Sequence, residues 1–185
     1  MGLFTPPAGA SDLIPRRLPD LAHGATLIFL GRCEAISCHW NPDHSLILTA
    51  NRFRILRSFK GAPGPTVTLE ELGGTVGDTH LEVSDAPRYA VGEEVLLFVR
   101  RTPLGRWATA GAGQGRLGIV RDAHGRPWVL SDVYRRDLAA MASDMKPGHA
   151  PLAVFVGWLQ ATLKAVTAPP FCPQTGCWSS LGATV

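Results

Sequence analysis

Alternating apolar and polar positions along the first two thirds of the chain predict a protein built mainly of β-strands. The clearest alternation lies in residues 45–59, where Phe53 and Ile55 fall on one face of a strand and Arg52 and Arg54 fall on the other. One face of such a strand packs on a core while the other meets solvent. This segment is therefore expected to be a half-buried strand.

Further strands are expected at residues 26–38, 66–70, 94–100, 107–110 and 116–121. The run from Val95 to Val99 is apolar throughout, which indicates burial on both faces. The turn sequence Asn-Pro-Asp-His at 41–44 predicts that the strands on either side of it pair antiparallel. About six strands at short spacing favour a barrel or a sandwich.

Apolar residues recur at helical spacing near both ends of the β region. A short helix is expected at 18–23, a weaker one at 132–141, and a longer one at 151–166 with its apolar stripe packed on the core. The expected organisation is an N-terminal arm at 1–17, a β-domain at 18–130, and a helical extension with a cysteine-containing tail at 131–185.

Composition narrows the class of protein further. The 185 residues include 20 glycines and 15 prolines, and 45% are hydrophobic against 18% charged, which excludes intrinsic disorder and disfavours an all-helical bundle. The formal net charge of +3 comes mostly from scattered arginines, whereas nucleic-acid binders concentrate their basic residues. Residues 1–10 lack the features of a secretory signal, and the longest apolar run, 151–166, is too short to span a membrane.

Two patterns resemble ligand sites but are read as structural. Gly113-Gln-Gly-Arg-Leu-Gly118 has the glycine spacing of a dinucleotide-binding loop, but a strand rather than a helix is expected after it. These glycines are therefore assigned to a bend or bulge. Cys33, Cys38, His39 and His44 cluster at spacings that match no zinc site. No metal or cofactor is expected.

The positions of the cysteines suggest one structural disulfide, and the positions of the carboxylates suggest no catalytic site. Cys172 and Cys177 flank a Pro- and Gly-containing turn, which favours a small-loop disulfide, with a link from Cys38 to the tail as the alternative. The neighbouring carboxylates of Glu70 and Glu71 are expected on opposite faces of a strand, so they form no catalytic dyad. With no recognisable nucleophile or metal motif, the chain is not expected to be an enzyme.

Several short motifs of the β region together resemble a known family. They are Phe59-Lys-Gly61, Tyr89-x-x-Gly-Glu-x-Val-Leu-Leu-Phe98 and Gln114-Gly115. In this order they are similar to bacterial proteins with a fold like that of the tissue inhibitors of metalloproteinases, related to netrin modules. The resemblance covers residues 18–122 and implies a closed OB-like barrel of five to six strands with flanking helices, in an exported protein.

The resemblance does not carry over the inhibitors' mechanism. Those proteins ligate a protease zinc through an N-terminal cysteine, whereas this chain begins Met1-Gly2 and its first cysteine is Cys33. The expected function is therefore a non-enzymatic, exported module, extracellular or in the cell envelope, that binds an unidentified protein. A structural component of a cell-surface assembly is the first alternative. An OB-fold that binds single-stranded nucleic acid is the second.

Overall fold

A computed structural model describes residues 16–141 and 148–165 of the chain. Its elements, in chain order, are α1 (Leu18–Gly24), β1 (Leu27–Trp40), β2 (Ile47–Lys60), β3 (Thr66–Leu72), β4 (Gly74–Val76), β5 (Thr79–Leu81), β6 (Glu94–Arg101), β7 (Trp107–Thr109), β8 (Arg116–Arg121), β9 (Pro127–Leu130), α2 (Arg135–Met141), β10 (His149–Pro151) and α3 (Leu152–Ala165). The mainly β composition expected from the sequence is confirmed.

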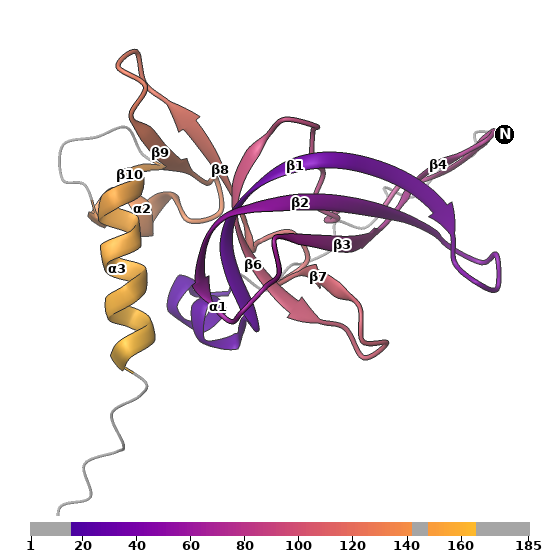
Figure 1. Cartoon of the computed structure of the whole chain (residues 1–185), viewed down its shortest axis with the longest axis horizontal. Helices are drawn as coiled ribbons and strands as arrows, with labels where there is room; N and C mark the ends of the chain where they lie inside the picture. Colours follow the sequence, from indigo (N-terminus) through magenta and orange to yellow (C-terminus); the bar gives the residue numbers. More distant parts are fainter. Residues whose placement is uncertain (1–15, 142–147, 166–185) are drawn as a thin grey trace, which may run out of the picture.

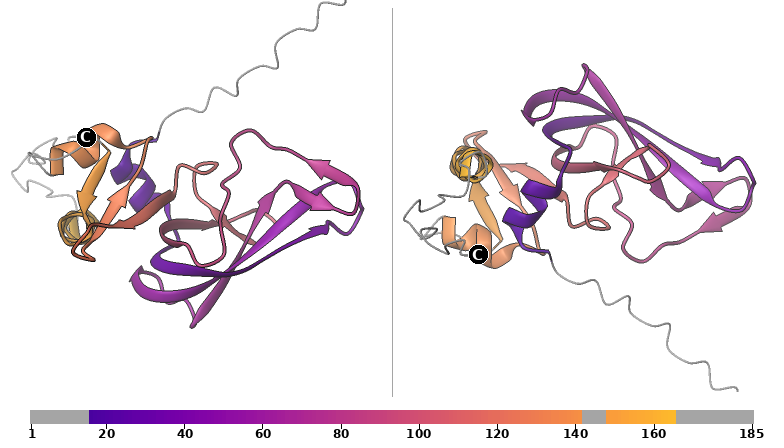
Figure 2. Two further views of the ribbon diagram at one scale, coloured as in Figure 1. Left: turned by 90° about the horizontal axis from the view of Figure 1, so that it is seen from above. Right: turned by 90° about the horizontal axis from the view of Figure 1, so that it is seen from below.

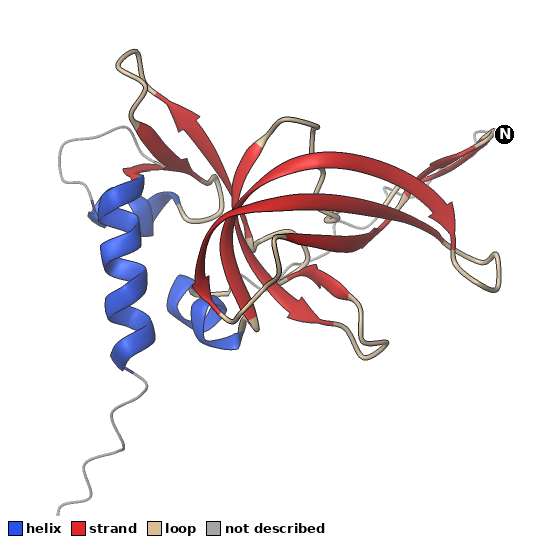
Figure 3. Cartoon of the chain, in the orientation of Figure 1, coloured by secondary structure: helices blue, strands red, loops and turns tan. Residues whose placement is uncertain are grey.

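One antiparallel sheet of eight strands forms most of the described structure. Its strands are hydrogen-bonded in the order β10-β9-β8-β6-β1-β2-β3, and β7 pairs with β6 beside this path. Figure 1 shows the long β1–β2 ribbon curving over β3 and β7, while β8, β9 and β10 lead away to the helices. Figure 3 shows in another colouring that the helices gather at one end of the sheet.

The expected closed barrel is wrong, because no sheet in the described residues closes on itself. The sheet ends at β3 on one side and at β10 on the other. The strand β7 lies beside β3, yet the two share no ladder of backbone hydrogen bonds. The sheet instead continues from β6 through β8 into β9 and β10, two strands that were not predicted from the residue pattern. The result is a curled open sheet.

Two hydrophobic cores lie on opposite faces of this sheet. The inner core fills the curl and contains Leu27, Phe29, Cys33, Phe53, Val67, Leu69, Val95, Leu97 and Val99. The helical core packs the three helices on the other face, around residues that include Ile28, Leu96, Phe98, Leu117 and Phe155. Figure 2 shows the curl and the helical end as neighbouring parts of the molecule. Strand β6 contributes alternate residues to both cores, which confirms the burial on both faces expected for 95–99.

Gly113 and Gly115, assigned from the sequence to a bend or bulge, lie in a turn directly before β8, whereas Gly118 lies within that strand. Gly113 has a φ of 88°, a conformation that side-chain-bearing residues rarely adopt. A Cβ on Gly115 would lie 2.7 Å from the carbonyl oxygen of Phe98 and 2.8 Å from that of Ala110. The strand β8 follows directly, so no helix begins at these glycines to hold a pyrophosphate.

We expect Gly115→Ala to lower the free energy of unfolding by about 1–3 kcal/mol, because the added methyl group would collide with rigid backbone. Gly157→Ala on α3 is the matched control, since a Cβ there meets nothing within 4 Å. That substitution should raise stability by about 0.5–1 kcal/mol. Urea unfolding of both variants checks the pair. Equal effects of the two substitutions would contradict the close packing at Gly115.

Candidate functional site

The strongest candidate site lies at the seam, the line where β3 faces β7. The Gly73 N–H donates to the Ile47 carbonyl and the Ile55 N–H to the Pro65 carbonyl, which fixes the alternation of β3 against β2. By this alternation the backbone groups of Glu70 point away from β2, toward the seam. On β7, the Ala110 N–H donates back to β6, so the alternating Thr109 N–H points toward the seam as well.

Side chains bridge the seam in place of a strand ladder. A carboxylate oxygen of Glu71 accepts a hydrogen bond of 2.7 Å from the Thr109 backbone N–H. The adjacent Glu70 carboxylate forms an ion pair of 2.9 Å with Arg106, which directly precedes β7. The hydroxyls of Tyr89 and Thr109 lie 2.5 Å apart. These contacts bring β3, β7 and the segment before β6 together around one buried carboxylate.

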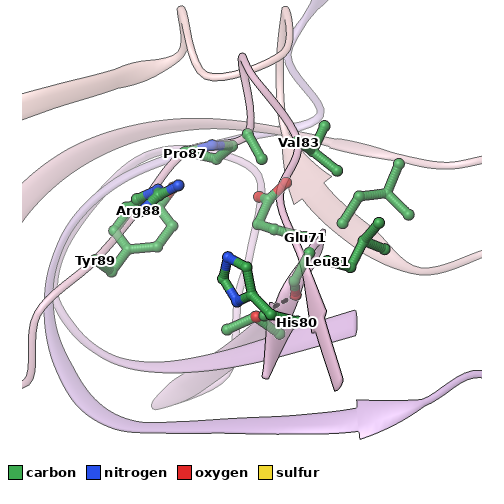
Figure 4. Close-up of a pocket in the computed structure, with 12 residues that line it drawn as sticks. Glu71, His80, Leu81, Val83, Pro87, Arg88 and Tyr89 are labelled. Atoms are coloured by element: carbon green, nitrogen blue, oxygen red, sulfur yellow. Dashed lines mark hydrogen bonds between the residues drawn. The ribbon is translucent and has the colours of Figure 1, made fainter. Parts of the chain in front are cut away.

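Two hollows adjoin Glu71 along the seam. The smaller, of about 220 Å³, is lined by residues that include His80, Arg88 and Tyr89. The larger, of about 460 Å³, is called the seam hollow here. It is lined by residues 70–72 of β3, 83–87 of the following segment, Arg100, Thr102, Ala108, Thr109 and Ala112. In Figure 4 the Glu71 side chain lies between Val83 and Pro87, with His80 on its other side.

The environment of Glu71 favours its neutral form. Its side chain is only 8% exposed, and burial raises the pKa of its carboxyl from 4.5 to about 7. Hydrogen bonds from Thr109 and the positive charge of Arg100 oppose that rise. Burial, together with the nearby charge of Glu71, also raises the pKa of Tyr89, so its phenol stays protonated. Glu71 therefore changes charge close to neutral pH.

The arrangement is suited to binding. The Glu71 carboxylate faces a concave, largely apolar space, and a hollow of about 460 Å³ falls within the range of ligand pockets. Perturbed carboxyl groups in clefts are common at functional sites, although ion-pair networks produce them as well. The seam supplies a hydrogen-bond acceptor in the lining of a largely apolar recess, and a negative charge there when Glu71 is ionised.

The sequence-predicted disulfide between Cys172 and Cys177 lies outside the described residues. Among the described residues, Cys33 and Cys38 form no disulfide with each other, and the alternative link from Cys38 to the tail also lies outside those residues. Cys33 is buried in the inner core, where burial raises its pKa, and Cys38 lies 3.4 Å from the Thr49 hydroxyl. Within residues 16–141 and 148–165, no three His, Cys, Asp or Glu side chains are grouped so as to hold a metal ion.

The sequence placed Glu70 and Glu71 on opposite faces of a strand, and the structure confirms that placement. It did not show that Glu71 is buried. The signal was present, because Val67, Leu69 and Glu71 share one face and the first two belong to the inner core. A carboxylate that continues an inward-facing apolar series is a sequence-level indication of a buried charge.

Several arginines of the strands form ion pairs with carboxylates that lie among them. Glu94 pairs with an arginine of β1 at 2.5 Å and with one of β8 at 2.9 Å. Glu34 pairs with Arg52 and Arg54 of β2, at 3.9 and 3.1 Å. The nucleic-acid alternative requires a basic groove, and these pairs place acidic groups directly among the arginines.

Every helix in the described parts of the chain falls short of the length and apolarity needed to traverse a bilayer.

Comparison with known proteins gives no family for the chain. The sequence matches no protein-family model and no curated protein. The resemblance to the inhibitor-like proteins therefore stays a prediction.

Proposed function

We propose that the chain is a non-enzymatic module that binds another protein at the seam hollow. The observation that carries this proposal is the hollow itself, an apolar recess of about 460 Å³ between two strand edges that no strand ladder joins. Recesses with apolar walls and few polar groups are the usual form of a binding site. Export is proposed on the family resemblance alone.

Exposed leucines at the seam support a protein partner. Leu72 lines the seam hollow and is 47% exposed, and Leu104, in the turn that joins β6 to β7, is 79% exposed. Thr102 of that turn also lines the hollow. Large apolar side chains beside a recess are typical of surfaces that a partner covers. The hollow and the exposed Leu72 at its edge together offer an apolar docking surface.

The test is a selection of peptides from a random display library against the intact chain, repeated on two variants. Ser84→Trp places a large ring at the exposed wall of the seam hollow. Val133→Trp is the matched control, because Val133 is 55% exposed and precedes α2 at the helical end. Selected peptides should bind the wild type and Val133→Trp equally, and Ser84→Trp at least about tenfold more weakly.

Three results would contradict the proposal. The first is a set of peptides that bind Ser84→Trp as tightly as the wild type. The second is salt-sensitive micromolar binding of single-stranded oligonucleotides, which would favour the nucleic-acid alternative. The third is self-association in sedimentation experiments that Ser84→Trp abolishes, since this would make the seam an assembly contact between copies.

A further inference from the structure

The charges around the seam hollow are predominantly negative. Three carboxylates line it, those of Glu70, Glu71 and Asp85, against the single guanidinium of Arg100. Glu70 is paired with Arg106, which leaves Glu71 and Asp85 facing one cation. Ionised Glu71 therefore gives the recess a net negative charge, and a cationic group is the ligand that complements it.

Most of the exposed lining of the hollow is apolar. Its apolar residues are Leu72, Val83, Ala86, Pro87, Ala108 and Ala112, and its uncharged polar residues are Ser84, Thr102 and Thr109. A largely apolar hollow with a buried carboxylate in its lining matches the side chains of lysine and arginine, which have an aliphatic stem and a charged end. A small inorganic cation would leave these walls without contacts. The shape and the charge therefore point to the same kind of group.

The Glu71 carboxylate retains the capacity to accept such a group. Its hydrogen bonds from the Thr109 backbone N–H and hydroxyl use two of about four acceptor positions that a carboxylate offers. Arg100 lies close enough to lower the Glu71 pKa, but forms no ion pair with it in the described structure. Arg100 is therefore a competitor for an incoming cation.

From this geometry we infer that the seam hollow binds a lysine or arginine side chain of the partner protein, with the charged end at Glu71 and the stem along Val83 and Pro87. The inference rests on the proposed function and adds the chemical class of the ligand. The bound side chain would compensate a charge that the fold otherwise leaves in an apolar setting.

The experiment follows the Thr109 amide signal by NMR in the intact chain at about pH 8, above the Glu71 pKa of about 7. The probes are the peptides acetyl-Gly-Arg-Gly-amide and acetyl-Gly-Lys-Gly-amide. Their neutral counterparts carry citrulline or norleucine at the central position. At least one basic peptide should shift the Thr109 signal and bind about tenfold or more tightly than its neutral counterpart.

Three variants separate recognition of the cation from general damage to the fold. Glu71→Gln keeps an acceptor for the Thr109 N–H, and should abolish the preference for the basic peptide. Arg100→Ala removes the competing cation, so it should tighten binding several-fold, a gain that a merely structural role would not produce. Glu82→Gln is the control, because Glu82 is exposed, belongs to the same segment, and does not line the hollow.

Each remaining outcome decides against the inference. Equal binding of basic and neutral peptides would overturn it while leaving a protein-binding seam intact. Methylguanidinium that binds as tightly as the arginine peptide would make the hollow a site for small-molecule cations. If none of these short peptides binds, and the library-selected peptides bind Ser84→Trp as tightly as the wild type, the proposed function fails together with the inference.

Discussion

Leu97→Ala is expected to lower the free energy of unfolding by about 2–5 kcal/mol, as truncation of a fully buried leucine does. Leu97 has no exposed surface and lies in the inner core, opposite Phe29 in the β1–β6 pairing. Its removal leaves a cavity in the inner core, whose residues come from β1, β2, β3 and β6. Those strands are fixed by their ladders and cannot collapse far into the space.

Urea unfolding monitored by tryptophan fluorescence gives the measurement, and Leu104→Ala gives the control. Leu104 undergoes the same chemical change but is 79% exposed, so its truncation should alter stability by less than about 0.5 kcal/mol. A loss below about 0.5 kcal/mol for Leu97→Ala as well would contradict the inner core as described.

Glu71→Gln is expected to stabilise the protein above neutral pH by up to about 3 kcal/mol. The folded-state pKa of Glu71, about 7, exceeds the ordinary value of 4.5, so the folded chain holds its proton more tightly than the unfolded chain. Stability therefore falls as the pH rises from about 4.5 to about 7. The gap between the two values corresponds to about 3 kcal/mol. Glutamine carries no charge to bury and still accepts from Thr109.

The check is a pair of unfolding curves for the wild type and Glu71→Gln, at about pH 8 and about pH 4. The variant should be more stable at the higher pH, and the difference should vanish at the lower pH, where the Glu71 carboxyl is protonated in both states. Glu82→Gln, the same chemical change at an exposed carboxylate, is the control. A variant that is less stable than the wild type at pH 8 would show that the charge at Glu71 supports the fold.

Local pattern predicted the strands well, because alternation and apolar runs report burial directly. The Val95–Val99 run is buried on both faces, and the inward Phe53 lies in the inner core. Patterns within single segments could not predict whether the sheet closes into a barrel. Whether β3 and β7 pair depends on contacts between segments about 40 residues apart, and there a carboxylate occupies the position that a strand ladder would need.

The same long-range dependence explains why the site was missed. The order of residues along β3 shows which way Glu71 points, but its burial is set by β7 and by residues 83–87, which sequence spacing does not bring together. Strand β9 was missed for a different reason. It starts at Pro127 after a Gly-containing turn, where turn-forming residues outweigh the short apolar stretch that follows.

The alternation of β6 between the two cores has a consequence for how the molecule melts. Leu96 and Phe98 belong to the helical core while Leu97 belongs to the inner core, so β6 is shared by both cores. Unfolding of the helices would expose one face of β6 to solvent, and unfolding of the curled strands would expose the other. The free energy of unfolding of the inner core therefore depends on the helical core, and the reverse. The described parts should unfold in a single cooperative transition. Amide protons of β1 and β6 should be the last to exchange with solvent.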